Sequence, residues 1–212
     1  LYGNIEPCGC VDNMLGGLDK IAHIIESTPH ELFLHSGNFL FPKEANEKKM
    51  KQDYEKAKVI VSVFDKLSLS ASTLGLNDID IMNRIANDSA ENSFFSKLQL
   101  TRNIIFSIRD NNFIVLVKVL SYSNTLDFES EKNEILNHID YNKAKLKILL
   151  LQTHDKTDTS TLEYFSEIFD LIVLSPGAEV GKKVPPPKLI HKSLVFEAGS
   201  EGQFLAHLQI PY

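Results

Sequence analysis

The fold of this chain is decided by the run Leu146-Lys147-Ile148-Leu149-Leu150-Leu151-Gln152. A short apolar run of this kind is typical of a strand buried on both faces of a sheet. Helical spacing follows from Ser160 to Phe169, and a second buried strand is expected at Leu171 to Leu174, closed by Ser175-Pro176-Gly177. Strands that alternate with helices predict an α/β protein with its helices on the outside.

The same alternation continues toward the N-terminus. Apolar residues recur at three- and four-residue steps from Glu47 to Leu67, which predicts an amphipathic helix. A strand is expected from Leu67 to Thr73, and helical spacing resumes from Ile79 to Ala86. The short apolar segment Glu31 to His35 predicts a buried strand that leads into the loop Ser36-Gly37-Asn38. Loops at the carboxyl ends of strands are where such sheets hold their ligands.

Two further regions are β-rich. Leu98 to Ile105 and Phe113 to Leu120 predict an antiparallel pair, because Asp110-Asn111-Asn112 suits a hairpin turn. Near the C-terminus, Leu194 to Ala198 and Gln203 to Ile210 predict two strands around a glycine-containing turn. The remaining predictions are a helix over Phe128 to Ile139 and a stiff surface connection over Lys182 to Lys188. Together these elements predict stacked mixed sheets.

Composition limits the classes of function. The chain has 212 residues, of which 43% are hydrophobic and 24% charged, and this predicts one globular domain over residues 1–212. The formal net charge is −6, and no basic stripe is present, so a nucleic-acid polymer is not an expected partner. No window reaches the roughly 18 apolar residues that a membrane span requires.

Both cysteines lie in one tripeptide, Cys8-Gly9-Cys10, and therefore cannot cross-link distant parts of the fold. Three interpretations remain open for them. Two thiolates at this spacing can face one metal ion, with His154 at a strand end as a third ligand. They can instead form a redox pair, or they can pack as small residues in a tight turn. His154 has its own alternative, a histidine hydrogen-bonded within a loop.

The run Gly3-Asn4-Ile5-Glu6-Pro7-Cys8-Gly9-Cys10, followed by Gly16-Gly17-Leu18, resembles the opening of the bacterial 5′-nucleotidase-like branch of the calcineurin-like metallophosphoesterases. The order and spacing of further matches extend the resemblance along nearly the whole chain. These matches are Ser36-Gly37-Asn38, Gly75-Leu76-Asn77-Asp78, His154, and a final hairpin over Gly199 to Leu208.

This resemblance implies a fold, an activity and a location. The fold is a four-layer α/β/β/α sandwich of mixed sheets, and the activity is hydrolysis of phosphate esters by two divalent ions, with zinc, manganese and iron as candidates. Two such ions activate a water molecule and stabilise the charge that develops on the phosphoryl oxygens. The implied ligand is a small phosphorylated molecule, and the implied location is the bacterial cell envelope or periplasm, reached with an export signal that is then removed.

The sequence departs from the family at most ligand positions. Tyr2 stands where the family has its first histidine, and Asn38 stands where it has the bridging aspartate. Leu76 replaces a ligand asparagine, Asn77 replaces the catalytic histidine, and the late histidine motif reads Pro176-Gly177-Ala178-Glu179. An amide bridges two ions poorly, because it offers one neutral oxygen where a carboxylate offers two charged oxygens.

The resulting candidates form two groups. Cys8, Cys10, Asn38 and His154 are the candidate metal ligands, and Asp78 and Asn77 are the candidate catalytic residues. Asp78 has the alternative of capping a helix, and Asn38 that of ending a strand in a turn. Three functions follow: a phosphoesterase with a non-standard metal site, a catalytically inactive binding or thiol-redox module of the cell envelope, and a structural partner domain.

Overall fold

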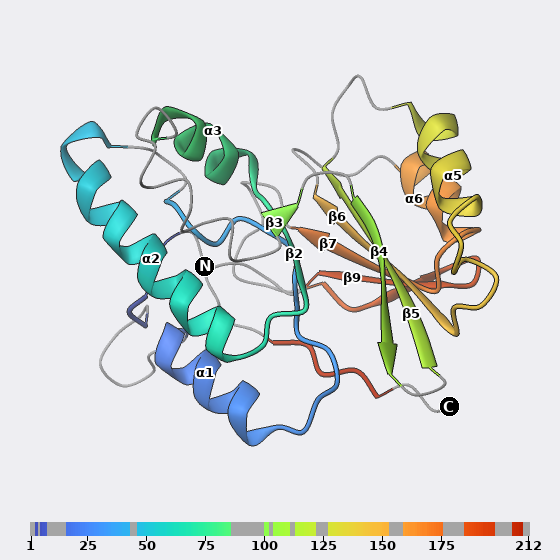
Figure 1. The fold of residues 1–212 in the computed structure, drawn as a ribbon, viewed down its shortest axis with the longest axis horizontal. Helices are drawn as coiled ribbons and strands as arrows, with labels where there is room; N and C mark the ends of the chain where they lie inside the picture. Colours follow the sequence, from blue (N-terminus) through green and yellow to red (C-terminus); the bar gives the residue numbers. More distant parts are fainter. Residues whose placement is uncertain are drawn as a thin grey trace.

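The computed structural model describes residues 3, 5–7, 16–42, 46–85, 100–101, 104–110, 113–121, 127–152, 159–175, 185–197 and 205–209. Within these residues the chain is an α/β protein with two sheets, one of three strands and one of six (Figure 1). The predicted fold class is therefore confirmed at this level. No helix in the described part of the chain has both the length and the apolar character needed to span a membrane.

The N-terminal half contributes the smaller sheet and the helices beside it. The elements in chain order are α1 (Leu18–Ser27), β1 (Leu34–His35), the 3-10 helix η1 (Glu47–Lys49), α2 (Met50–Lys66), β2 (Ala71–Thr73), α3 (Leu76–Ile85) and β3 (Leu100–Thr101). The strand order is β1-β2-β3, and both pairs are parallel. The carboxyl ends of β1 and β2 therefore lie at the same edge of this sheet.

The C-terminal half builds the larger sheet. Its elements are β4 (Ile104–Asp110), β5 (Phe113–Ser121), α5 (Phe128–Leu136), β6 (Leu146–Gln152), α6 (Thr159–Ser166), β7 (Leu171–Ser175), β8 (Lys188–Ile190) and β9 (Ser193–Glu197). The strand order is β4-β5-β6-β7-β9-β8, in which β5, β6, β7 and β9 run parallel and both edge strands are antiparallel. The sheet is mixed, as predicted.

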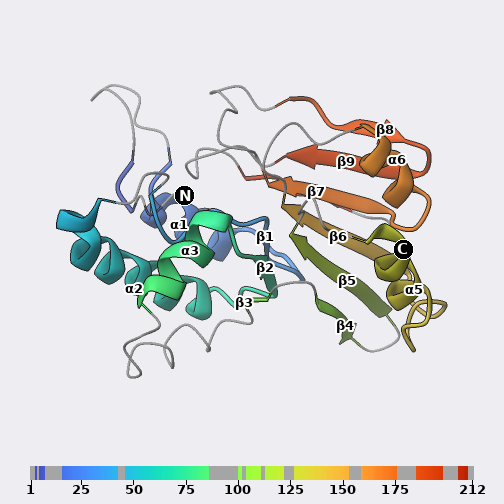
Figure 2. The ribbon, with the colours of Figure 1, turned by 90° about the horizontal axis from the view of Figure 1, so that it is seen from above.

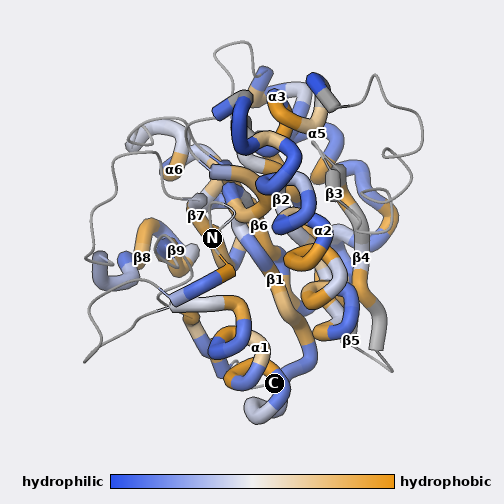
Figure 3. The backbone as a smooth tube through the Cα atoms, turned by 90° about the vertical axis from the view of Figure 1, so that its left-hand side faces the viewer, coloured by the Kyte–Doolittle hydropathy of each residue, from blue (hydrophilic) through white to orange (hydrophobic). Residues whose placement is uncertain are grey.

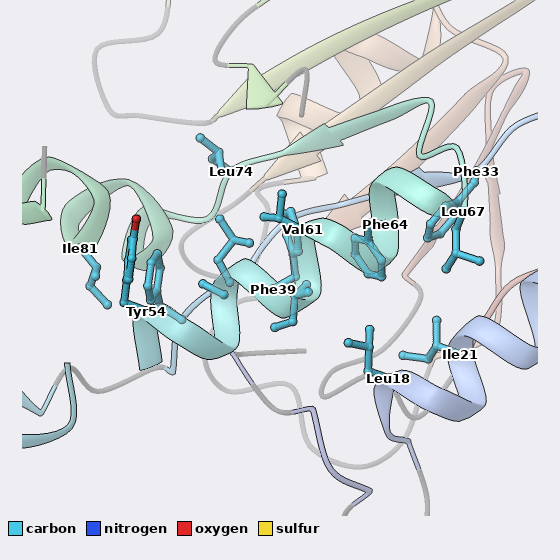
Figure 4. Packing of buried hydrophobic residues seen from close by; sticks show 14 of the residues in the cluster. Leu18, Ile21, Phe33, Phe39, Tyr54, Val61, Phe64, Leu67, Leu74 and Ile81 are labelled. Atoms are coloured by element: carbon cyan, nitrogen blue, oxygen red, sulfur yellow. The ribbon is translucent and has the colours of Figure 1, made fainter. Parts of the chain in front are cut away.

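In the described ranges, buried hydrophobic residues form three clusters, each between different elements. The first contains Leu18, Phe39, Ile60 and Phe64 and joins α1, α2 and α3 to the loop after β1 (Figure 4). The second joins β2 to one face of the larger sheet, and the third joins the other face of that sheet to α5 and α6. Figure 2 accordingly shows α1, α2 and α3 on the far side of the smaller sheet, with α5 and α6 beyond the larger one.

The two faces of β5 show how period-two alternation directs this packing. Val115, Val117 and Val119 belong to the cluster that contacts the smaller sheet, whereas Leu120 belongs to the cluster beneath the helices. Lys118 is also fully buried, and its Nζ lies 2.7 Å from Oε2 of Glu131 on α5. A buried ammonium group requires such a partner. One face of β5 is thus apolar, and on the other face Lys118 forms an ion pair that links the strand to α5.

Amphipathic helices cover the smaller sheet. In Figure 3 the tubes of α1 and α2 alternate between hydrophilic and hydrophobic stretches. On α2 the buried residues are Tyr54, Ala57, Ile60, Val61 and Phe64, which follow the three- and four-residue spacing that the sequence predicted. The prediction of a helix over 47–67 is confirmed, with its first turn formed by η1.

Several predicted boundaries were wrong. Helix α3 begins at Leu76 rather than at Ile79, so Asn77 and Asp78 lie within its first turn and not at its cap. Among the described residues, the strand predicted at 98–105 corresponds to the whole of β3 and to the first two residues of β4. Strand β4 continues to Asp110, which pairs with Phe113 in the hairpin.

The C-terminal hairpin prediction also failed in its second half. Residues 205–209 are exposed and form no strand, although 203–210 was predicted as one. The reason lies in the strand order: β9 has β7 on one side and β8 on the other, so neither of its edges is free to pair with a later segment. Lys188, which was expected in a surface connection, begins strand β8.

Candidate functional site

The candidate site lies where the carboxyl ends of strands from both sheets meet. In the larger sheet, Gln152 at the end of β6 pairs in register with Ser175 at the end of β7. In the smaller sheet, β2 ends at Thr73, and β1 leads into the loop that begins at Ser36. The side chains of Gln152, Ser175 and Thr73 are all buried. The edge is therefore lined by polar groups that the protein has taken out of water.

Asn38 connects the two sheets at this edge. Its Nδ2 donates a hydrogen bond to Ser175 Oγ at 3.1 Å, across a separation of 137 residues in sequence. The backbone of Asn38 has a φ of 55°, a left-handed conformation that asparagine adopts more readily than most residues. Of the two sequence alternatives for Asn38, the structure describes the turn that follows β1, and the role of Asn38 as a metal ligand stays a prediction.

Asp78 holds the loop that carries Asn38. Its carboxylate accepts hydrogen bonds from the backbone N–H groups of Phe39, Leu40 and Phe41 at 3.1 to 3.2 Å. It also accepts one from Gly75 N–H at 3.2 Å. Gly75 immediately precedes α3 and Asp78 is the third residue of that helix, so this last bond is half of a capping box. The predicted capping role is replaced by a related one, in which the side chain reaches back to the helix start.

The environment of Asp78 is closed to solvent. The residue is fully buried, and this burial raises the pKa of the carboxyl group to about 6, while the N–H donors of Phe41, Phe39 and Gly75 act in the opposite direction. Both carboxylate oxygens already accept backbone hydrogen bonds. This geometry favours a role in positioning the loop over direct contact with a substrate.

His35 supports the same loop from the other side. Its ring lies 4.6 Å from the ring of Phe39 and 5.6 Å from that of Phe64, measured between centroids. Nδ1 accepts a hydrogen bond from Gly37 N–H at 3.0 Å, which requires that this nitrogen carry no proton. Burial lowers the pKa of His35 to about 3. No role was predicted for this histidine, because its packing between two phenylalanines has no local signal in the sequence.

Two glycines allow the loops to approach one another. A Cβ atom on Gly75 would lie 1.9 Å from Asn38 Oδ1 and 2.9 Å from Asn38 Cα. A Cβ atom on Gly37, whose φ is 99°, would lie 2.3 Å from Thr73 Oγ1. Only glycine fits at either position without displacing its neighbour. The loops after β1 and β2 are therefore in direct contact beside the Asn38 amide.

Gly75→Ala is expected to destabilise the protein by about 3 kcal/mol, because the new methyl group overlaps a residue whose loop cannot easily move. The overlap is with the side chain and Cα of Asn38, in a loop held by Asp78. Urea unfolding of the two proteins measures this loss.

A double-mutant cycle provides the control for Gly75→Ala. Asn38→Gly removes the overlapping side chain and tolerates the left-handed backbone, so it should recover at least half of the loss. Strictly additive losses would show that the methyl group does not meet Asn38.

Thr73 has a feature that the sequence did not predict. Its Oγ1 is buried and has no hydrogen-bond partner among the described residues. Ala71, two residues earlier on β2, packs in the cluster between the sheets, so the period-two pattern turns Thr73 toward the larger sheet as well. Ser175, Thr73 and Gln152 were not identified as site residues from the sequence. Thr73 and Gln152 are the last residues of predicted strands, and Ser175 directly follows one, so each could have been found from its position.

Several sequence candidates fall outside the described residues. Cys8, Cys10 and His154 are among them, and so are Tyr2 and the 176–179 segment. Asn77 is described only as a backbone position in α3. Asn38 and Asp78 are therefore the predicted site residues that the structure places, and it brings both to the same loop contact. Among the described residues, no group of three or more His, Cys, Asp and Glu side chains could hold a metal ion.

Comparison with known proteins agrees with the fold. No protein family matches the sequence, and no curated protein matches it significantly. One solved crystal structure is similar to this chain with a TM-score of 0.52 and 13% sequence identity, covering 86% of this chain and 84% of that one. At this identity the likeness concerns the fold alone. The similarity in fold extends over most of the length of both chains.

Proposed function

We propose that this protein is a metallophosphoesterase-like binding module of the bacterial cell envelope that does not hydrolyse phosphate esters through a two-metal centre. On this proposal the chain keeps the family's four-layer α/β/β/α scaffold. The first layer would be α1, α2 and α3, the two sheets would follow, and α5 and α6 would form the last. The three hydrophobic clusters, each joining one adjacent pair of these layers, support this interpretation.

The observation that carries the proposal is the chemical nature of the Asn38 side chain and its contacts. At the position where the resemblance implies a bridging carboxylate, the chain has a neutral amide whose Nδ2 is bonded to Ser175 and whose Oδ1 lies against Gly75. A pair of divalent ions needs charged oxygens close to both. The described residues at this edge do not fit a dinuclear metal centre.

The same edge suits a ligand held by neutral groups. Hydroxyl groups come from Ser175 and Thr73 and an amide from Gln152, each at the carboxyl end of a strand. Asn38, in the loop after β1, supplies a second amide. The Thr73 Oγ1 atom is buried and has no hydrogen-bond partner within the described part of the chain, so a bound molecule can satisfy it. Following the resemblance, we take the ligand to be a small phosphorylated molecule, bound through its hydroxyl or base groups as well as through phosphate.

Metal analysis together with a hydrolysis assay tests the proposal. The full chain, purified without chelators, is expected to hold far fewer than two equivalents of zinc, manganese or iron by mass spectrometry. Turnover of p-nitrophenyl phosphate with any of these ions should not exceed the rate without protein. Asn38→Asp should not restore turnover, because Leu76 and Asn77 also lack the family's ligands. Two bound ions with turnover that a chelator abolishes would refute the proposal.

A binding measurement tests whether the protein binds a small phosphorylated molecule. Titration calorimetry with adenosine 5′-monophosphate in the presence of a chelator should give a binding heat. Thr73→Val removes one hydroxyl at nearly constant shape, and it should weaken this binding by about tenfold if the hydroxyl bonds the ligand. The exposed Ser27 on α1, changed to alanine, is the control and should leave binding unchanged.

A further inference from the structure

We infer that the three consecutive N–H groups of Phe39, Leu40 and Phe41 form an anion-binding nest and that Asp78 is its built-in ligand, which sets the position of Asn38. The inference goes beyond the proposed function and does not depend on it. It concerns how the loop after β1 acquires its shape, whatever the site at the sheet edge binds.

The geometry of the loop is that of a nest. Successive backbone N–H groups converge on one anion where the chain turns through a left-handed residue. Here the left-handed residue is Asn38, with a φ of 55°, and the three groups that follow it donate to the Asp78 carboxylate. Both Oδ1 and Oδ2 are used, since Leu40 and Phe41 donate to the first and Phe39 to the second.

The anion comes from a different element of the same chain. Asp78 lies on α3, 37 to 39 residues from its three donors, and Gly75 at the start of that helix supplies a fourth donor. Burial of Phe39, Leu40 and Phe41 leaves solvent no access to their amides. The carboxylate is therefore the group that satisfies these donors, and it ties the loop of Asn38 to the glycine that contacts Asn38.

Replacement of the ligand by a free anion tests the inference. Asp78→Ala removes one carbon and two oxygens, which are the three heavy atoms of formate. The variant in the full chain should be destabilised, and formate should restore stability in a saturable way. Formate at ten times its Kd is expected to raise the ratio of folded to unfolded protein about elevenfold. Formamide, which has the same size without the charge, should restore nothing, and chloride at equal ionic strength should restore little.

A second variant changes the size of the space that the Asp78 side chain leaves. Asp78→Gly removes one carbon more, so acetate should stabilise it more strongly than it stabilises Asp78→Ala. Asp80→Ala, in the same helix with an exposed side chain, should respond to none of these anions. Equal effects of formate on Asp78→Ala and Asp80→Ala would overturn the inference, because they would show a general salt effect.

A measurement on the unmodified protein covers the case in which both variants fail to fold. The amide proton signals of Phe39, Leu40, Phe41 and Gly75 should move together in an NMR pH titration, with one shared midpoint from the Asp78 carboxyl group. His35, whose ring contacts Phe39, also titrates beside this loop, and its pKa is well below that of Asp78. Four separate midpoints, or no movement, would contradict a common anion.

Discussion

Replacement of Asp78 by alanine is expected to lower the free energy of unfolding by about 4 kcal/mol at pH 7, as the balance of two opposing effects. The substitution leaves four backbone N–H groups without their acceptor in the interior. Each unsatisfied buried donor costs roughly 1 to 3 kcal/mol, so the total loss is about 7 kcal/mol. The four donors are buried together, so little of this loss is recovered from water.

The opposing effect is relief from a buried charge. Burial raises the pKa of Asp78 from 3.8 to about 6, so ionising this group in the folded protein costs about 3 kcal/mol more than in water. Alanine removes that cost, which leaves the net loss of about 4 kcal/mol. Urea unfolding measures it, with Asp80→Ala as the matched control. The Asp80 carboxylate pairs with Arg84 on the helix surface, and its removal should cost about 0.5 kcal/mol or less. Equal losses for the two variants would contradict the assignment.

His35 is expected to make the protein sensitive to acid. Its pKa is about 3 in the folded protein and about 6.5 in the unfolded chain, so only the unfolded chain takes up a proton between these values. Unfolding is therefore favoured as the pH falls from about 6.5 toward 3, and the contribution of His35 is fully present only above 6.5. The loss reaches at most about 4 kcal/mol near pH 3.

The main physical cause is burial of the ring, and the bond from Gly37 acts in the same direction. A proton on Nδ1 would place a donor against the Gly37 N–H group, and it would put a charge between two phenylalanine rings. His35→Phe should remove this sensitivity at the cost of about 1 kcal/mol at pH 7, because Gly37 N–H loses its acceptor.

The measured quantity for His35 is the difference in stability between wild type and His35→Phe at each pH, in which the other titrating groups cancel. This difference should favour the wild type at pH 7 and reverse in sign as the pH falls. The cancellation matters most for Asp78. Because its pKa is raised, Asp78 makes the folded protein more stable as the pH falls from about 6 to 4, which is the opposite of the effect of His35. His30→Phe, at an exposed position, is the control and should run parallel to wild type. A difference that does not vary with pH would refute the prediction.

Most of the fold was predictable, because period and burial are recorded locally in the sequence. Strand β6 was predicted at its observed boundaries, and α2 within one residue at its end, since both have continuous patterns. The wrong predictions arose where the structure depends on which strands pair with one another. Whether 203–210 is a strand depends on whether β9 has a free edge, and no local pattern contains that information.

The site was less predictable than the fold. Asn38 and Asp78 were found because they lie in recognisable motifs at strand ends, yet their hydrogen-bond partners could not be read from the sequence. Ser175 lies 137 residues from Asn38, and the donors to Asp78 come from a loop on another strand. The sequence alone does not show whether an aspartate is buried and accepts backbone hydrogen bonds or lies in an open cleft. Only the tertiary contacts distinguish them.

The bond between Asn38 and Ser175 has a consequence for biosynthesis. Loop closure over so long a segment is slow, and the donor leaves the ribosome well before its acceptor is made. The smaller sheet and its helices can assemble during translation, but their polar edge must wait for β7 to emerge. A nascent chain released before Ser175 would therefore expose that edge unpaired, and such a truncated product is an expected target for chaperones and proteases.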